Sequence, residues 1–301
     1  MSLNQELIKK FKNNISNNIN LSNYSWFNLG GPAEYFFKPE NKKQLIEFLH
    51  ENKKNNFKIT ILGAGSNTLI RDNGIKGVVI KLGSNFSSIK LVNKETIEAG
   101  AAVLDRKISN FAKTNGIGNL EFLSCIPGSI GGAVIMNSGC YNNEISKVLI
   151  SINVIDIKEC KEKEIKKEEI KFFYRGTNLS KDLIITSVKL KGTSESTDII
   201  QNKQNDMIEK KKLTQPSQIK TCGSTFKNTS NGKKAWQLIK ESGCGEFKEG
   251  DAMISKKHCN FFVNNGKAKS ADIEKLINKV KKTVSDKAGV NLELEIKIVG
   301  E

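Results

Sequence analysis

Two polar residues of this 301-residue chain stand in surroundings suited to chemistry. Arg175 follows an aromatic run at residues 172–174 and precedes a glycine. A guanidinium in this setting can bind a carboxylate through two parallel hydrogen bonds, although a surface ion pair explains the same residues equally well. Ser224 also follows a glycine, and Lys227 and Asn228 lie just beyond it. These residues suit a proton donor beside an anion site, or a plain turn.

Serine-hydrolase chemistry does not fit the sequence around Ser224. No G-x-S-x-G elbow surrounds this serine, and only His50 and His258 exist to act as a base. We expect His258 to be a hydrogen-bonded structural residue and His50 to be a solvated helix position.

Two glycine-rich segments indicate a site for a phosphate ester. Residues 57–62, which we expect to form a strand, lead into the first segment at 63–68, and the second segment lies within residues 123–141. Glycines let the backbone approach a ligand closely and expose its N–H groups. Either segment alone could be an ordinary tight turn, but together they suggest a dinucleotide. The G-x-G-x-x-G fingerprint is not met, because Thr68 stands at its third glycine and Ser84 and Asn85 stand where an acid is needed about 20 residues further on.

Composition argues against several classes of protein. The net charge is +16, but the basic residues are interleaved with acids, as at residues 158–164, so we expect no nucleic-acid partner. No apolar run approaches the roughly 18 residues that span a bilayer, and the N-terminus has no apolar leader region, so we expect a cytoplasmic protein without a membrane partner. The 6 cysteines form no C-x-x-C pair and no metal-ligand spacing, which predicts reduced thiols and no metal site.

Hydrophobic periodicity predicts helices and strands around these segments. A strand within residues 24–37, a helix around 45–49 and strands at 57–62 and 77–82 fit a βαβ unit. A hairpin near 93–95, a helix at 103–114, strands at 149–157 and 183–190, and a helix over 199–208 follow, with a linker near 215–216. The clearest signals are a helix from Ser270, as its cap, to Gly289, and a half-buried strand at 290–298.

The motifs, taken in order, resemble those of the UDP-N-acetylenolpyruvoylglucosamine reductase (MurB) family. They lie at residues 26–33, 61–80, 126–141, 174–178, 223–228, 252–264 and 289–300, and the arrangement is similar to the shorter, type II form of the enzyme. Three positions depart from the family pattern. Asn28 stands where a basic residue is usual, Cys222 where a small residue is usual, and Leu294 where proline is common.

The resemblance implies an α+β protein with a two-part FAD-binding domain of the vanillyl-alcohol-oxidase (PCMH) type, at residues 1–83 and 84–205, and a smaller α+β C-terminal substrate-binding domain at 206–301. It implies NADPH-dependent reduction of UDP-N-acetylglucosamine enolpyruvate to UDP-N-acetylmuramate, a precursor of peptidoglycan. Hydride would pass from N5 of non-covalently bound FAD to C3 of the enolpyruvyl group, and Ser224 would protonate C2. We expect a monomer.

The resemblance also assigns roles to single residues. Arg175 and Glu295 would polarise the substrate carboxylate and complete the catalytic set with Ser224. Periodicity cannot choose between Glu293 and Glu295, but the family's ending matches residues 295–297. The substrate-binding residues would be Tyr174, Lys227, Asn228 and His258. The FAD-binding residues would be Gly63, Ala64, Gly65, Ser66, Asn67, Thr68, Pro127, Gly128, Ser129, Gly132 and Ala133.

Two other classes compete with this interpretation. A related flavin oxidase would share the first domain but would be reoxidised rapidly by air without an enolpyruvyl acceptor. A nucleic-acid binder would be colourless and would be retained on DNA in a salt-dependent manner. The flavin absorbance of the purified protein separates the second class from the other two.

Overall fold

The structure, a computed structural model, describes residues 5–230 and 232–301 and divides into two compact units. The first unit consists of Met1–Ser16, Phe36–Ala64 and Gly77–Lys211, and the second of Asn17–Tyr35, Gly65–Lys76 and Lys212–Glu301. The chain therefore contributes three separate stretches to each unit. The three-part division after residues 83 and 205 stays a prediction.

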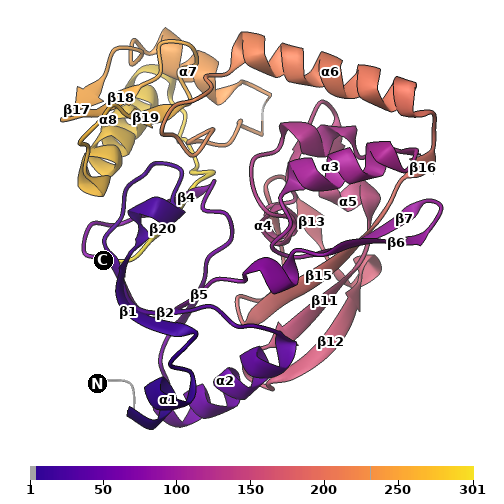
Figure 1. Ribbon diagram of the computed structural model, residues 1–301. Helices are drawn as coiled ribbons and strands as arrows, with labels where there is room; N and C mark the ends of the chain where they lie inside the picture. Colours follow the sequence, from indigo (N-terminus) through magenta and orange to yellow (C-terminus); the bar gives the residue numbers. More distant parts are fainter. Residues whose placement is uncertain (1–4, 231) are drawn as a thin grey trace. The chain divides into compact units, whose positions relative to one another are not determined.

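A five-stranded antiparallel sheet forms the framework of the first unit, with strand order β12-β11-β15-β7-β6 (Figure 1). The inner strands β11 (Leu149–Asp156) and β15 (Leu183–Lys191) are rich in β-branched residues, which favour the pleated conformation. Strands β6 (Ile89–Asn93) and β7 (Thr96–Gly100) form the hairpin predicted near residues 93–95. The outer strand β12 (Lys161–Lys166) is charged and mostly exposed, which protects this edge from pairing with other chains.

Helices α3 (Asp105–Thr114), α4 (Ile130–Ile135) and α5 (Ile145–Val148), with the 3-10 turn η3 (Glu121–Cys125), share one hydrophobic core with this sheet. Helix α3 ends at Thr114, just before Gly116, the residue predicted to stop it, and Gly116 has a φ of +66° in the left-handed region. In helix α6 (Thr197–Thr214), the buried Gln204 donates from Nε2 to Ser109 Oγ of α3 at 2.7 Å. The buried amide of Gln204 thus has its partner inside this core.

A second sheet has the order β1-β2-β5-β3, and the unit boundaries fall within three of its strands, β1 (Ile15–Asn20), β2 (Pro32–Phe37) and β5 (Ile75–Ile80). Helix α2 (Lys42–Asn55) links β2 to β3 (Ile59–Ile61), which pairs parallel with β5. The α2 helix begins where Asn41 accepts the Gln44 amide at 2.9 Å, and it ends at Asn56 in the left-handed conformation. In the first unit, Phe11, which follows α1 (Gln5–Lys10), packs with Phe37 and Phe48.

The second unit contains the antiparallel strands β17 (Lys248–Glu249), β18 (Ala252–Ile254) and β19 (Phe262–Asn264), which pack with α7 (Ala235–Glu241) and α8 (Ser270–Ala288). Helix α8 ends at Gly289, with φ +65°, as predicted. The predicted cap is wrong, because Ser270 is the first helical residue and Lys269 occupies the capping position. The predicted apolar face of α8 is buried and consists of Ile273, Leu276, Ile277, Val280 and Val284.

The strand predicted over residues 290–298 is wrong in extent. Only β20 (Lys297–Val299) is regular, and it pairs parallel with β4 (Thr68–Ile70). Just before it, Leu294 forms an isolated antiparallel bridge with Phe226. The segment changes both partner and pairing direction between these positions, so one continuous ladder cannot include both. The alternation of apolar residues is real, since Leu292 and Ile296 are buried, but it does not require a single strand.

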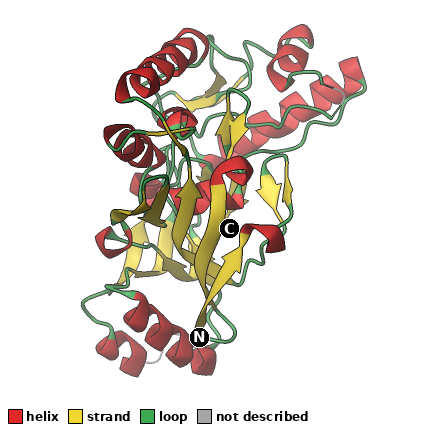
Figure 2. Ribbon diagram, turned by 90° about the vertical axis from the view of Figure 1, so that its right-hand side faces the viewer, coloured by secondary structure: helices red, strands yellow, loops and turns green. Residues whose placement is uncertain are grey.

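Short elements complete the chain, and helices and strands are mixed throughout, which confirms the α+β class (Figure 2). These elements are η1 (Leu21–Tyr24), η2 (Ser84–Phe86), η4 (Lys167–Glu169), β8 (Ile117–Gly118) and β16 (Thr193–Ser194), in addition to four strands described with the site.

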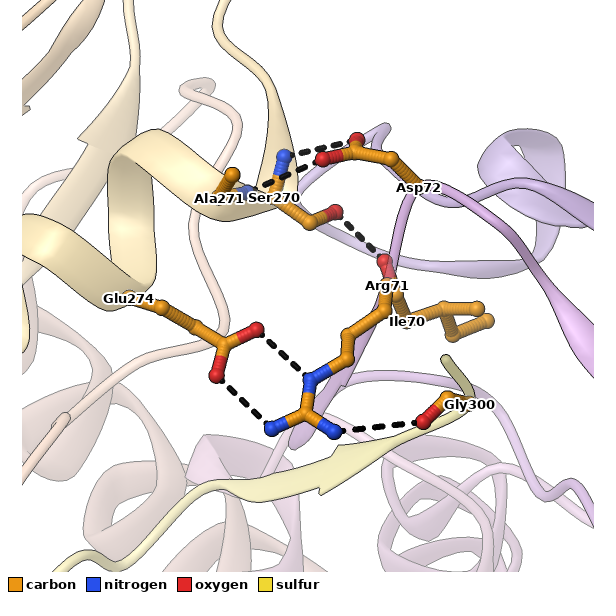
Figure 3. Close-up of polar contacts among 7 residues, drawn as sticks. All are labelled: Ile70, Arg71, Asp72, Ser270, Ala271, Glu274 and Gly300. Carbon is orange, nitrogen blue, oxygen red and sulfur yellow. Dashed lines mark hydrogen bonds and ion pairs between the residues drawn. The ribbon is translucent and has the colours of Figure 1, made fainter.

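Two neighbouring charged residues join the stretch after β4 to α8 and the C-terminus within the second unit (Figure 3). Asp72 accepts the amides of Ser270 at 2.9 Å and Ala271 at 3.0 Å, so a carboxylate from a distant part of the sequence satisfies the start of α8. Arg71 binds both carboxylate oxygens of Glu274, at 2.8 and 2.9 Å, and donates to the Gly300 carbonyl at 3.3 Å. The Ser270 hydroxyl donates to the Ile70 carbonyl. We call these contacts the Asp72–Arg71 clasp.

We predict that Asp72→Ala lowers the free energy of unfolding by about 1 kcal/mol, because two amides at the start of α8 lose their acceptor. Chemical denaturation followed by circular dichroism measures this change. Asp286→Ala is the matched control, since Asp286 is an exposed carboxylate near the other end of the same helix, where a negative charge is unfavourable. Equal losses in the two variants would contradict the capping role of Asp72.

Candidate functional site

The start of the first glycine-rich segment, at Gly63, lies next to Ser129 of the second segment in the first unit, although about 65 residues separate the two in the sequence. A Cβ atom added to Gly63 would lie 3.1 Å from Ser129 Oγ, and one added to Gly132 would lie 3.8 Å from the same atom. Gly63, Pro127 and Gly132 are exposed, whereas Ser129 is buried. The structure thus places an accessible, nearly side-chain-free surface where the sequence predicted a phosphate site.

The backbone of the second segment is held from behind by the chain that follows β7. The amides of Ile130 and Gly131 donate to the carbonyls of Val103 and Ala101, at 2.9 and 3.0 Å. The Ala133 amide donates within its own turn, to Ser129. These three amides already have partners, so the candidates for contacting a phosphate are the amides of Gly128, Ser129 and Gly132. A contact from Ala133 would come from its carbon atoms.

A lysine that the sequence reasoning missed holds the first segment. Lys81 Nζ donates to the Gly63 carbonyl at 2.6 Å. Burial lowers the pKa of Lys81, and the nearby Lys38 adds to this effect. Lys81 comes directly after β5, and its distance in sequence from the glycines matches no known motif, so the sequence does not reveal this contact. It brings positive charge close to the exposed glycine surface.

The rest of the first segment belongs to the second unit, where its carbonyls face the protein. The Gly65 carbonyl accepts the Trp26 amide at 3.1 Å, and the Thr68 carbonyl accepts the Ser25 hydroxyl at 2.9 Å. Gly65 has φ +70°, and a Cβ there would overlap the Tyr24 carbonyl oxygen at 1.8 Å, so no other residue fits.

The family departures are accommodated in this second unit. Cys222 is buried behind the turn, its Sγ lies 3.6 and 3.5 Å from the Gly65 and Thr68 carbonyls, and burial raises its pKa to about 12. Asn28 adopts φ +54°, a conformation that asparagine tolerates well, and its amide donates to the Ser25 carbonyl at 2.8 Å. Leu294 makes the isolated bridge to Phe226 and packs against the core.

Arg175 lies in the first unit at the tip of a hairpin formed by β13 (Phe172–Phe173) and β14 (Gly176–Thr177). Its φ of +57° is unusual for a residue with a side chain, and such conformations concentrate at functional sites. Its guanidinium lies 4.9 Å from the centre of the Tyr174 ring and donates from Nη2 to the Gly139 carbonyl at 3.2 Å. Gly139 belongs to β9 (Gly139–Cys140), which pairs with β10 (Asn143–Glu144).

Asn137, which the sequence reasoning did not single out, connects this hairpin to the second glycine segment. Its side chain is buried, donates to the Phe173 carbonyl at 3.3 Å and accepts the Ser146 amide at 3.0 Å. Its φ of +41° explains why an asparagine stands there. Asn137 therefore positions the strand that leads directly to Tyr174 and Arg175.

Ser224 and Glu295 lie on neighbouring backbone segments in the second unit. The Glu295 amide donates to the Thr225 carbonyl at 2.9 Å, and Ser224 forms an isolated antiparallel bridge with Phe261. Both residues are partly buried. The structure thus brings together two of the three predicted catalytic residues, which are 71 positions apart in the sequence.

Asn260, another residue that the sequence reasoning missed, fixes the segment that carries Ser224. Its side chain accepts the Phe226 amide at 2.9 Å and donates to the Phe226 carbonyl at 2.8 Å. The Asn260 side chain thus makes the two hydrogen bonds to Phe226 that the backbone of a neighbouring strand would otherwise make, and it is almost completely buried. On the other side, Asn67 donates to the Glu295 carbonyl at 3.0 Å. No sequence motif reveals these pairings.

The two candidate carboxylates differ in their surroundings. The Glu293 side chain is 78% exposed and forms an ion pair with Lys227 Nζ at 3.5 Å, whereas Glu295 is half-buried. Exposed ion pairs contribute little free energy, so Lys227 can leave Glu293 for another anion.

The other predicted substrate-binding residues have structural contacts. Asn228 accepts the Ala235 amide at 3.1 Å with its side-chain oxygen, at the start of α7. His258 accepts the Asn260 amide at Nδ1, 3.2 Å away, and its ring lies 4.7 Å from that of Phe261. Burial lowers the pKa of His258, which keeps the ring neutral at neutral pH. His50 is an exposed position of α2, as predicted.

Within residues 5–230 and 232–301, no cluster of three or more His, Cys, Asp and Glu side chains is arranged to hold a metal ion. None of the helices in that part of the chain is long and apolar enough to cross a membrane.

Comparison with known proteins agrees with this geometry. The family description "FAD binding domain" matches residues 33–161, and "UDP-N-acetylenolpyruvoylglucosamine reductase, C-terminal domain" matches residues 215–299. The chain is 48% identical to the UDP-N-acetylenolpyruvoylglucosamine reductase of Pelagibacter ubique over 98% of this chain and 99% of the relative. It is 43% identical to that of Rickettsia bellii, over 94% of this chain and 92% of the relative.

A solved structure shows the same fold. The crystal structure of the MurB from Thermus caldophilus superposes with a TM-score of 0.83 at 30% identity, covering 95% of this chain and 99% of that chain. The two matched family descriptions together cover the glycine segments and the part that carries Ser224 and Glu295. The chain belongs to the UDP-N-acetylenolpyruvoylglucosamine reductase family and contains an FAD-binding domain.

Proposed function

We propose that this protein reduces UDP-N-acetylglucosamine enolpyruvate to UDP-N-acetylmuramate, with NADPH as the electron donor and FAD as a non-covalent cofactor. The observation that carries the proposal is the backbone pairing between the segment that contains Ser224 and the segment that contains Glu295, in a chain whose relatives carry this reductase name over nearly their full length.

The residues around the glycine surface fit FAD. The absence of side chains at Gly63 and Gly132 leaves open space beside Ser129, which a Cβ atom at either position would partly fill. Lys81 supplies positive charge next to Gly63. Backbone amides and a nearby cation are the features that bind a pyrophosphate. The bound FAD supplies hydride chemistry, accepting hydride from NADPH and delivering it to C3 of the enolpyruvyl group.

Arg175 and Glu295 are proposed to bind the substrate carboxylate. When C3 gains hydride, negative charge develops at C2 and spreads into this carboxylate, so donors already in position there lower the barrier. Arg175 offers a guanidinium, and the backbone of this residue is held in a rare conformation. Glu295 contributes as a protonated acid that donates a hydrogen bond. Its half-buried position suits this role better than the exposed position of Glu293.

Ser224 is proposed to protonate C2. A serine hydroxyl is a weak acid in water, but the enediolate is a strong base, and positioning the two in contact makes the transfer feasible. The Asn260 side chain and the Glu295 amide hold the backbone on the C-terminal side of Ser224. The Cα atom that carries the hydroxymethyl side chain is therefore held in place.

The overall function is tested by NADPH oxidation. We predict that the purified protein is yellow, that acid precipitation releases the colour to the supernatant, and that rapid NADPH consumption requires UDP-N-acetylglucosamine enolpyruvate. Oxygen-dependent consumption without this substrate would favour a flavin oxidase instead. Colour retained in the precipitate would contradict non-covalent binding.

We predict that Ser224→Ala separates the two half-reactions. Flavin reduction by NADPH needs no proton at C2, so it should stay near the wild-type rate, while reoxidation by substrate falls by about a hundredfold or more. Stopped-flow absorbance follows each step separately. Equal slowing of both steps would mean that Ser224 is structural or contacts NADPH. Thr229→Ala, five residues along, is a control for the loss of a hydroxyl.

We predict that Glu295→Gln lowers turnover by about a thousandfold, because an amide cannot supply a carboxylic proton to the developing charge. FAD content should not change. Glu293→Gln is the matched control, since it alters the neighbouring exposed carboxylate two residues away and should do little. If Glu293→Gln is the more damaging change, the catalytic assignment belongs to Glu293.

A further inference from the structure

An exposed tryptophan stands close to the residues proposed to bind the substrate in the second unit. Trp236 lies in the short helix α7 and is 37% exposed. The buried face of this helix consists of Ala235, Leu238 and Ile239, so the core of the unit does not use the indole ring fully. Tryptophan is strongly buried on average because its ring is large and mostly apolar. An indole left exposed beside a ligand site is therefore a candidate for contact with the ligand.

Two of the proposed substrate-binding residues contact α7 or the indole ring directly. Asn228 holds the start of α7, because its side-chain oxygen accepts the Ala235 amide at 3.1 Å. The His258 ring lies 6.2 Å from an indole ring of α7, centre to centre, with 56° between the two ring planes. The same histidine ring lies 4.7 Å from that of Phe261, which forms the isolated bridge with Ser224. A short series of contacts thus connects the indole to the segment of the proposed proton donor.

The contacts of His258 determine which of its ring nitrogens can donate a hydrogen bond. Burial lowers the pKa of the ring, which is therefore neutral at neutral pH, and Nδ1 accepts the Asn260 amide at 3.2 Å. A neutral imidazole that accepts at Nδ1 carries its proton on Nε2, so Nε2 is a donor. The carbonyl oxygens of a uracil base are acceptors for a donor of this kind.

The chain around α7 is locally basic. Residues 225–240 contain four lysines, at positions 227, 233, 234 and 240, and no aspartate or glutamate. The Lys227 ammonium forms an ion pair with the exposed Glu293 at 3.5 Å, and an incoming phosphate can replace that partner at little cost. Lysine binds phosphates as a point charge. An exposed indole within a basic stretch therefore offers partners to both the base and the phosphates of a nucleotide.

We propose that the Trp236 indole stacks on the uracil base of the substrate's UDP group, with the neighbouring lysines facing its phosphates. This inference rests on the proposed function, because it takes the UDP group from the proposed substrate. The other base that the reaction brings to the protein is the adenine of NADPH. We assign uracil because the indole lies beside His258, and because Asn228, which is also proposed to bind the substrate, holds the start of its helix.

The first test uses the fluorescence of the holoenzyme, because the chain contains only the tryptophans Trp26 and Trp236. In Trp26→Phe, UDP should quench the fluorescence of Trp236 until binding saturates. In Trp236→Phe, the fluorescence of Trp26 should stay constant in the same titration. Binding of UDP, measured by calorimetry, without a change in the Trp236 fluorescence would overturn the proposal. An equal response from Trp26 would also overturn it, since the signal would then not be local.

The second test removes the ring. Trp236→Ala should raise the dissociation constant for UDP, measured by calorimetry, about tenfold or more, which is typical of the loss of base stacking. Inorganic pyrophosphate has no base and should bind equally well to the wild type and to this variant. Gln237→Ala removes the next exposed side chain of α7 and is the matched control, with unchanged affinity for UDP. Equal losses for UDP and pyrophosphate, or no binding of UDP by the wild type, would overturn the proposal.

The third test separates the two bases. NADP⁺ should bind equally well to the wild type and to Trp236→Ala, and a larger loss for NADP⁺ than for UDP would mean that the ring binds adenine instead. In steady-state assays, KM for the enolpyruvate substrate should rise about tenfold in this variant, whereas KM for NADPH, the FAD content and the urea midpoint of unfolding should not change. The binding of UDP is measured without turnover. A wild-type protein that binds UDP through Trp236 but does not oxidise NADPH would support this inference and contradict the proposed reaction.

Discussion

The second unit depends on one constraint: residues 65–76, inserted into the chain of the first unit, must be anchored to the C-terminal part. The Asp72–Arg71 clasp achieves this by joining the stretch after β4 to the start of α8 and to Gly300. The parallel pairing of β4 with β20 continues the attachment. As a result Asn67, in the first glycine segment, can bond to the carbonyl of Glu295, more than 200 residues further along the chain. A turn proposed to bind the cofactor and the carboxylate proposed for catalysis are in this way built on the same support.

Asparagine side chains hold the functional segments in both units. Asn137 joins the end of the second glycine segment to the hairpin of Arg175, and Asn260 pairs with both backbone groups of Phe226, two residues after Ser224. Asn137 bonds to the end of β13 and to the first turn of α5, and Asn260 takes the place of a backbone partner beside Phe226. An amide side chain suits this task because it carries a donor and an acceptor at the spacing of a peptide group. In each unit the proposed functional residues therefore lie on irregular backbone that side-chain hydrogen bonds hold in place, which suits both positioning and access for ligands.

The glycine segments have two kinds of glycine. Gly65 is required by packing, since any side chain there would overlap the Tyr24 carbonyl, whereas Gly63 and Gly132 face open space beside Ser129. Only glycines such as Gly63 and Gly132, which face open space, indicate room for a ligand. Cys222 belongs with Gly65, because it fills space behind the same turn.

Local signals in the sequence determined much of the secondary structure. The apolar stripe of α8 with Gly289 after it, the hairpin at β6 and β7, and the stop of α3 at Gly116 follow from periodicity and from the conformational freedom of glycine, which act within a few residues. The family motifs, read in order, likewise indicated FAD and the reductase family before any geometry was known.

Tertiary structure alone decided which distant residues meet. The strand expected at 290–298 is interrupted because Leu294, in its middle, pairs antiparallel with Phe226, whereas the end that forms β20 pairs parallel with β4. The contacts of Lys81, Asn137 and Asn260 left no local pattern, since each depends on the approach of chain segments that are separate in the sequence. Hydrophobic periodicity indicates which side of a helix or strand is buried, but it does not indicate which other segment packs against that side. The contacts listed above depend on the identity of that other segment.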